Sequence, residues 1–285
     1  MAVTYDQLLK LSEKDVPHHY TERDTLLYAV SIGMGRDPLN QDELQYVYEK
    51  TPLEVVPTQA IVLARHNLIW DIGLNVEKFL QGENTLKFFR SLPVEANLLA
   101  DSRVVEIYDK GPKGCLIETE TVARIAETGE KLYRLGSIVF ARADVGIGGT
   151  TRKAPRPHEL PKRTPDIVRR SETRRDQALL YRLNGDRNLV HIDARVAREA
   201  GFERPILHGA CTYAIACREV LASVCRYDAA QIEEFDVRYT AVVLPGETVE
   251  TQIWVDDREV SFRCVVAERN SIVIDHGRCI LRATQ

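Results

Sequence analysis

The sequence predicts an α+β fold in which an antiparallel sheet packs against a helix in each of two similar halves. Residues 92–142 and 244–282 both read strand, turn, strand, turn, strand, and both open with Leu-Pro followed two positions later by Glu. Residues 209–225 are apolar or small on most helical faces, as in a buried helix. We therefore predict two domains, 1–150 and 176–285, joined by a Pro-rich and basic linker over 151–175.

Length and composition exclude several classes of protein. A chain of 285 residues can bury a sizeable core, and a net charge of −4 argues against a chain built mainly to bind nucleic acid. No apolar run approaches the ~20 residues that span a bilayer, and neither end of the chain resembles a targeting signal. The six cysteines form no Cys-x-x-Cys pair, which favours reduced core thiols. We expect a cytoplasmic protein that does not enter membranes.

Local patterns predict the individual elements. Thr21 begins a helix over 21–33 with an acidic first turn, and Asp193 caps a short helix that ends at Gly201. The segment "QALLYRL" (177–183) is predicted as a strand. Further strands are predicted at 233–243, 247–257, 259–268 and 272–283.

Several patterns resemble binding sites but have simpler interpretations. The Gly-rich segments 31–37 and 144–151 lack the helix that a dinucleotide site requires after the loop, so we interpret them as turns. The spacing of His191, His208 and Cys211 matches no established zinc pattern, and we predict no metal. The basic linker is interpreted as a solvated connection; attraction of a phosphorylated ligand is the alternative, and nucleic acid is the weakest reading.

The segment "YRLNGDRNLVHID" (181–193) holds candidates for proton transfer. Asp186 and His191 are five positions apart, about 500° of helical rotation, so they cannot share one helical face. They can converge only around a turn, and Gly185 tolerates the backbone angles that such a turn needs. Asn188 can orient these groups or hold a water molecule. A purely structural turn remains the alternative.

The segment "ILHGACT" places His208 and Gly209 at the start of the predicted buried helix. The first N–H groups of a helix have no partner within it, and the helix dipole adds partial positive charge there. Such a terminus can stabilise an oxyanion, and glycine permits close approach of a substrate. An acid–base pair beside this terminus would suit chemistry next to a carbonyl, although a capped structural helix has the same pattern.

Residues 181–218 resemble the signature of the MaoC-like, or hydratase 2, family, because Gly-Asp-x-Asn, His-Ile-Asp, Ala-Gly-Phe and Pro-Ile-Leu-His-Gly occur in order. The resemblance extends over nearly the whole chain. It implies a double hotdog: two antiparallel sheets, each wrapping a long central helix, and assembly as a homodimer. It also implies reversible hydration of trans-2-enoyl-CoA to (3R)-3-hydroxyacyl-CoA, with the first half accommodating the acyl tail.

The resemblance assigns roles to the candidate residues. Asp186 and His191 would hold the water and exchange protons, Asn188 matches the motif's Asn, and the Gly209 N–H would polarise the thioester carbonyl. His208 and Gly185 are predicted to contact substrate. No metal or redox cofactor is expected, because CoA arrives as part of the substrate.

Two departures from the family pattern stand out: Leu189 replaces a Pro, and Gln81 replaces a His. The Gln81 change bears on substrate range more than on reaction type. Three alternatives stay open: a MaoC-like dehydratase for a branched or polycyclic acyl-CoA, a non-catalytic acyl-CoA-binding protein, and a hotdog thioesterase.

Overall fold

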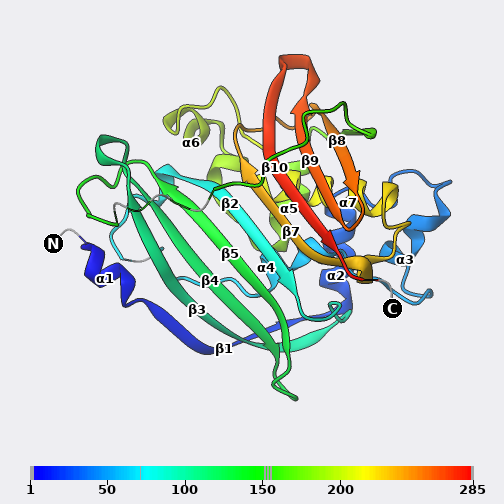
Figure 1. Ribbon diagram of the computed structural model, residues 1–285, viewed down its shortest axis with the longest axis horizontal. Helices are drawn as coiled ribbons and strands as arrows, with labels where there is room; N and C mark the ends of the chain where they lie inside the picture. The colour runs from blue at the N-terminus through cyan, green and yellow to red at the C-terminus, as the bar shows by residue number, and fades with distance from the viewer. Residues whose placement is uncertain (1–2, 71, 151, 153, 155, 284–285) are drawn as a thin grey trace.

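Ten antiparallel strands form one continuous curved sheet, with helices packed behind it in the view of Figure 1. The computed structural model describes residues 3–283 except 71, 151, 153 and 155. The strand order is β1-β3-β4-β5-β2-β7-β10-β9-β8-β6. The strands are β1 (Ser12–Tyr20), β2 (Phe79–Phe88), β3 (Ala96–Asp109), β4 (Cys115–Ile125), β5 (Lys131–Ala141), β6 (Ile167–Glu172), β7 (Ile232–Tyr239), β8 (Thr248–Asp256), β9 (Glu259–Val266) and β10 (Ser271–Leu281).

The two halves of the sheet have the same strand order when each is read from its outer edge. The first half runs β1-β3-β4-β5-β2 and the second runs β6-β8-β9-β10-β7. This symmetry confirms the internal similarity seen in the sequence. The prediction of two sheets is corrected in one respect: β2 and β7 pair from Glu83–Arg238 to Lys87–Glu234, so the two sheets are continuous.

The helices lie on the concave side of this sheet or at its ends. The longest is α7, in which ten of 15 residues are buried, and it fills the curve of the second half. The helices are α1 (Tyr5–Leu9), α2 (Glu22–Ser31), α3 (Leu44–Val47), α4 (Ala60–Leu63), α5 (Gln177–Tyr181), α6 (Ala194–Glu199) and α7 (Gly209–Ser223). Three short 3-10 helices also position the site: η2 (Pro57–Gln59), η5 (Arg182–Asn184) and η6 (Leu189–His191).

Among the described residues, a long central helix is present only in the second half, which corrects the expectation of one in each half. In the first half, η2 and α4 follow one another over just three and four residues. The apolar segment that forms α4 gives way to Arg65-His66-Asn67, and the backbone leaves helical geometry at Ala64. The first half therefore has less helix to fill the curve of its sheet.

Most predicted elements are confirmed. Thr21 caps α2, Asp193 accepts hydrogen bonds from the N–H groups of the first turn of α6, and Gly201 follows α6 with φ of 90°. The Gly-rich segment 31–37 forms turns, and in the loop 144–150 all three glycines have positive φ. All six cysteines are buried free thiols. No helix in the described part of the chain is long and apolar enough to cross a membrane.

Three predictions from local pattern were wrong or incomplete. Residues 177–183 form α5 and the start of η5 instead of a strand, because a short apolar run fits either structure. The predicted linker contains β6, which pairs with β8. The strand β1 was not predicted because its sequence, SEKDVPHHY, has few apolar residues. Residues 151, 153 and 155 of the linker lie outside the described residues.

Several basic residues of this segment form ion pairs with neighbouring carboxylates. Arg169 pairs with the buried Glu219 of α7, and Arg170 pairs with Glu250 of β8. Arg163 contacts both Asp166 and Asp256. These pairs favour a connection attached along the second half of the sheet over a site for an anionic ligand.

Candidate active site

The loop that follows α5 turns back on itself at Gly185. Asn184 fixes the approach to the turn by donating to the Tyr181 carbonyl at 2.8 Å and to Ser31 Oγ of α2 at 2.9 Å. Gly185 adopts a φ of 105°, a left-handed conformation that glycine reaches without the steric cost of a Cβ. The chain then reverses, and the Asp186 side chain points back toward η6.

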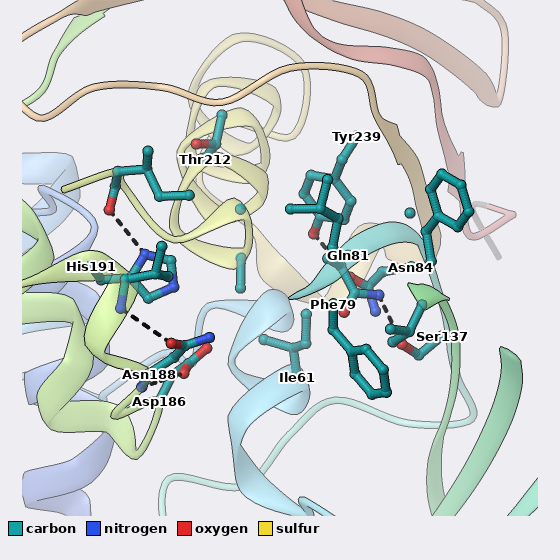
Figure 2. A pocket seen from close by; sticks show the side chains of 18 of the residues that line it. Ile61, Phe79, Gln81, Asn84, Ser137, Asp186, Asn188, His191, Thr212 and Tyr239 are labelled. Atoms are coloured by element: carbon teal, nitrogen blue, oxygen red, sulfur yellow. Dashed lines mark hydrogen bonds between the residues drawn. The ribbon is translucent and has the colours of Figure 1, made fainter. Parts of the chain in front are cut away.

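Asp186 and His191 converge around this turn, which is the arrangement that the sequence analysis allowed. A carboxylate oxygen of Asp186 and one ring nitrogen each of His191 and His208 lie within 4.8 Å of one another. The Asn188 N–H donates to Asp186 Oδ1 at 3.3 Å, and Asn188 Oδ1 accepts from the Val190 N–H at 3.1 Å. Figure 2 shows Asp186, Asn188 and His191 together on one side of the cavity. Asn188 thus holds the turn that brings the other two residues together.

The hydrogen bonds of the two histidines determine which ring nitrogens carry hydrogen. His191 Nδ1 lies 2.9 Å from the Ile206 carbonyl, and His208 Nε2 lies 3.2 Å from the Asp186 carbonyl. A carbonyl oxygen only accepts, so both of these nitrogens must donate. In the neutral His191 ring, Nε2 is then the unprotonated nitrogen and can accept a proton.

His208 supports His191 from behind. The two rings stack with centroids 3.6 Å apart and planes 26° apart, and the centroid of the Tyr181 ring lies 5.0 Å from that of His208. Neither His208 nor Gly185 is among the residues that line the cavity, whereas both were predicted to contact substrate. The structure assigns them instead to positioning the loop, because His208 is 1% exposed and Gly185 forms the turn.

The electrostatics of the site keep Asp186 charged and His191 neutral. Burial alone would raise the pKa of Asp186, but the Arg65 guanidinium and the Asn188 N–H hold that pKa below its usual value. Arg65 Nη2 lies 4.0 Å from Asp186 Oδ1. Burial also lowers the pKa of His191. Near neutral pH the site therefore presents a carboxylate and an imidazole base.

The cluster of Asp186, His191 and His208 is poorly arranged for a metal ion. Imidazole lone pairs lie in the ring plane, and ligation requires them to meet at one point. The nearly parallel, stacked rings direct their lone pairs side by side. The geometry suits proton transfer better than ligation.

Gly209 begins α7 beside these groups. No described residue accepts a hydrogen bond from the N–H groups of Gly209 or Ala210, and the N-cap residue His208 makes no side-chain cap bond. A Cβ at Gly209 would lie 3.2 Å from two carbons of the Tyr239 ring, closer than ordinary packing. The absence of a side chain keeps this helix terminus open, and its N–H groups can receive developing negative charge.

A cavity of about 460 Å³ joins the two halves at this site. Asp186, Asn188, His191 and Gly209 line it from the second half. Arg65, which the sequence analysis missed, lines it from the first half. No local pattern could have identified Arg65, because its relation to Asp186 depends on how the two halves pack.

Comparison with known proteins agrees with this architecture. Residues 18–143 match the MFE-2 hydratase 2 N-terminal domain, and residues 157–276 match the MaoC like domain. A protein of Dictyostelium discoideum named probable enoyl-CoA hydratase 2 is 31% identical over 292 positions, covering 99% of this chain and 97% of that protein. The chain belongs to the MaoC-like hydratase 2 family.

Comparison with solved structures shows that this chain has the double hotdog fold. The crystal structure of a MaoC-like dehydratase from Phytophthora capsici is 31% identical, with a TM-score of 0.85 and 98% of each chain covered. A Mycobacterium tuberculosis protein described as a double hotdog has a TM-score of 0.60 at 16% identity, with 98% of each chain covered. At that identity the likeness concerns the fold alone.

The two departures from the family pattern occupy different places in this MaoC-like chain. Leu189 begins η6 with its side chain 49% exposed, and the Asn188 cap holds the turn without a proline. Gln81 lines the cavity in the first half, at a bulge where β2 shifts register against β5 between Gln81 and Glu83. The first departure concerns the loop that carries Asp186 and His191, and the second concerns the cavity wall.

Proposed function

We propose that this protein catalyses the reversible addition of water to a trans-2-enoyl-CoA, giving a (3R)-3-hydroxyacyl-CoA. The observation that carries the proposal is the placement of the Asp186 carboxylate and the His191 base on the wall of one cavity, beside the open N-terminus of α7. Membership of the hydratase 2 family supports the same reaction.

The geometry supports a specific role for each residue in the reaction. Asp186 and His191 Nε2 both accept hydrogen bonds, so a water molecule between them would donate to both and direct its oxygen at C3. Attack forms the C3–O bond, breaks one O–H bond and transfers that proton to one of the two groups. C2 then takes up a proton from the protonated group, so H and OH have both been added. Proton transfer of this kind commonly contributes ~10²–10⁴-fold.

The negative charge that builds on the thioester oxygen during attack needs stabilisation. We assign this role to the Gly209 N–H at the start of α7, supported by the helix dipole. No step requires a metal or a redox cofactor, and CoA enters as part of the substrate. The same residues run the reverse dehydration.

Stereochemistry provides the decisive experiment. The α7 terminus would hold the thioester while Asp186 and His191 hold the water, so water reaches one face of the planar enoyl group. A difference of ~3 kcal/mol between the faces gives about a hundredfold preference. With crotonyl-CoA, loss of enoyl-thioester ultraviolet absorbance measures hydration. The product should support almost no NADH formation by a (3S)-specific 3-hydroxyacyl-CoA dehydrogenase; rapid NADH formation would overturn the (3R) assignment.

The same assay separates the alternatives. A dehydratase for a branched or polycyclic acyl-CoA would use the same residues and differ only in its substrate profile. A non-catalytic acyl-CoA-binding protein would leave the ultraviolet absorbance unchanged. A thioesterase would release free CoA, which a thiol reagent detects.

We also propose a homodimer located in the cytoplasm. Exposed apolar side chains on α2, α5 and η5 support self-association: Val30 is 44% exposed, Leu179 55% and Leu183 60%. Six buried free thiols suit a reducing compartment. Light scattering after size-exclusion chromatography tests the first proposal, and fractionation of cells tests the second.

A further inference from the structure

One wall of the cavity carries a row of hydrogen-bonding side chains that the reaction does not use. Four residues from four segments of the first half form it: His66 after α4, Gln81 of β2, Thr119 of β4 and Ser137 of β5. All four line the cavity. Figure 2 shows Gln81 and Ser137 across the cavity from Asp186 and His191. We refer to these four residues as the polar row.

The polar row is continuous across neighbouring strands. Thr119 and Ser137 are direct cross-strand partners in the β4–β5 register, so their side chains lie next to each other on one face. Gln81 Nε2 donates to Ser137 Oγ at 2.8 Å, and His66 Nε2 lies 3.3 Å from Thr119 Oγ1. The bonds join the four side chains into two pairs that meet at Thr119 and Ser137.

The hotdog fold does not require polar groups at this place. In the second half, β9 corresponds to β4, and its core-facing residues Val260, Phe262 and Cys264 are fully buried in the apolar core. Those side chains contribute to the core that α7 completes. The polar row instead lies where the shorter α4 leaves a cavity, so its hydroxyl, amide and imidazole groups border space that a ligand can enter.

The polar row retains unused hydrogen-bonding capacity. Gln81 Nε2 donates hydrogen bonds to Ser137 Oγ and to the carbonyls of Glu83 and Ile138. Because Ser137 is the acceptor in its bond with Gln81, its own hydroxyl hydrogen remains available. His66 Nδ1 is buried and has no partner among the described residues. Burial lowers the pKa of His66 to about 4, so its ring is neutral near pH 7. Polar groups that a ligand buries are nearly always paired, so an oxygen of a ligand beside Ser137 and Thr119 would form hydrogen bonds with their hydroxyl groups.

We propose that the acyl chain of the preferred substrate carries an oxygen function, a hydroxyl or keto group remote from the thioester, that Ser137 and Thr119 bind it, and that His66 holds the Thr119 hydroxyl in place. This inference rests on the proposed function, because it places the thioester at Gly209 and the acyl tail in the first half. A plain alkyl tail would bury the polar row without replacing its bonds to water, which disfavours that substrate.

The test compares trans-2-decenoyl-CoA with a series of its monohydroxylated analogues, in which the hydroxyl moves along the outer half of the chain. For at least one position we expect kcat/KM about tenfold above that of the plain substrate. Ser137→Ala and Thr119→Val should each reduce the ratio of kcat/KM for the hydroxylated analogue to kcat/KM for the plain substrate severalfold, toward one. Neither should change the rate on crotonyl-CoA, whose tail ends short of the outer half of the chain.

Thr121→Val is the matched control. Thr121 lies on the same face of β4 as Thr119 and is equally buried, but it bonds to Ser102 and does not line the cavity. It should leave the preference for the hydroxylated chain unchanged. If Ser137→Ala fails to fold, Thr119→Val gives the same comparison.

The outcomes separate this inference from the proposed function. Failure to hydrate crotonyl-CoA and decenoyl-CoA alike would contradict the proposed function and the inference that depends on it. Hydration of both, with no hydroxylated analogue preferred, would overturn the inference alone. An analogue preference that survives both Ser137→Ala and Thr119→Val would also overturn it, because the oxygen would then be recognised elsewhere.

Discussion

The two halves of the molecule share one strand order but differ in the helix that each sheet encloses. In the second half, α7 has 15 residues, and fully buried side chains such as Tyr213 and Leu221 fill the curve of the sheet. In the first half, α4 has four residues after the three of η2. The shorter helix leaves part of the first half unfilled, and the cavity of about 460 Å³ extends into it.

The segments that follow β1 and β6 show a related difference. Tyr28 of α2 and Tyr181 of α5 occupy corresponding places, with ring centroids 6.1 Å apart. Tyr181 is followed by the turn that presents Asp186, whereas the matching segment after Tyr28 continues through Gly33 to the buried Met34. One half therefore supplies the proposed reacting groups, and the other supplies space and a nearby charge.

The largest effect should come from removing the groups that only the second half carries. Asp186→Asn and His191→Ala should each reduce kcat by ~10²-fold or more, because each removes a proton acceptor for water. Turnover of crotonyl-CoA measures the loss, and circular dichroism checks the fold. Asp193→Asn is the control: it lies in the same loop and caps α6, and Asn caps a helix equally well. Near-normal turnover in a folded Asp186→Asn or His191→Ala variant would remove that residue from the mechanism.

A second effect should appear at the start of α7. Gly209→Ala places a methyl group 3.2 Å from the Tyr239 ring, so the ring or the helix terminus must move. We expect kcat to fall by roughly 10–10²-fold, in line with displacement of one oxyanion donor. The thermal unfolding temperature should change little by comparison. Unchanged kcat in this variant would show that the Gly209 N–H is not aimed at the thioester oxygen.

The catalytic loop could be predicted from the sequence because its geometry is local. A left-handed turn at Gly185, an Asn cap at Asn188 and an open helix start at Gly209 each depend on a few neighbouring residues. The strand pattern at 92–142 is equally local, since alternation along each strand identifies the buried face.

The features of the site that could not be predicted depend on contacts between distant segments. Arg65 meets Asp186, and Tyr239 lies against Gly209, only after the two halves join through β2 and β7. The side to which Gln81 points is set by the bulge in β2, which no alternation pattern reveals. The helix α5 was mistaken for a strand because seven residues are too few for periodicity to decide.

A third effect should reveal the charge that the first half contributes. Arg65→Gln removes the charge that most strongly lowers the pKa of Asp186, while the burial that raises this pKa remains. The pKa of Asp186 should therefore rise, and the acid limb of the pH profile of kcat should move to higher pH. At the midpoint of that shifted limb the variant should be several times slower than wild type, and near pH 8 the two should agree more closely.

Two variants sharpen the interpretation of this shift. Arg65→Lys keeps the charge and should retain most of the wild-type profile. Arg142→Gln removes another cavity arginine that makes no ion pair with Asp186, and its profile should match wild type. A shift of equal size in Arg142→Gln would point to the general field of the cavity instead of the Arg65–Asp186 pair.

The smallest effect should be a change in selectivity for acyl-chain length, and it distinguishes the roles of the two halves most directly. Val62 lies in α4 and lines the cavity, so Val62→Phe adds volume to the first-half wall. Because the proposed reacting groups belong to the second half, kcat for crotonyl-CoA should stay within about twofold of wild type. For decenoyl-CoA, kcat/KM should fall several times further, since the larger side chain takes space from the tail. Val145→Phe, at a first-half position that is 56% exposed and outside the cavity, should leave the ratio unchanged. A uniform loss on both substrates in folded Val62→Phe would mean that the first half takes part in the reaction itself.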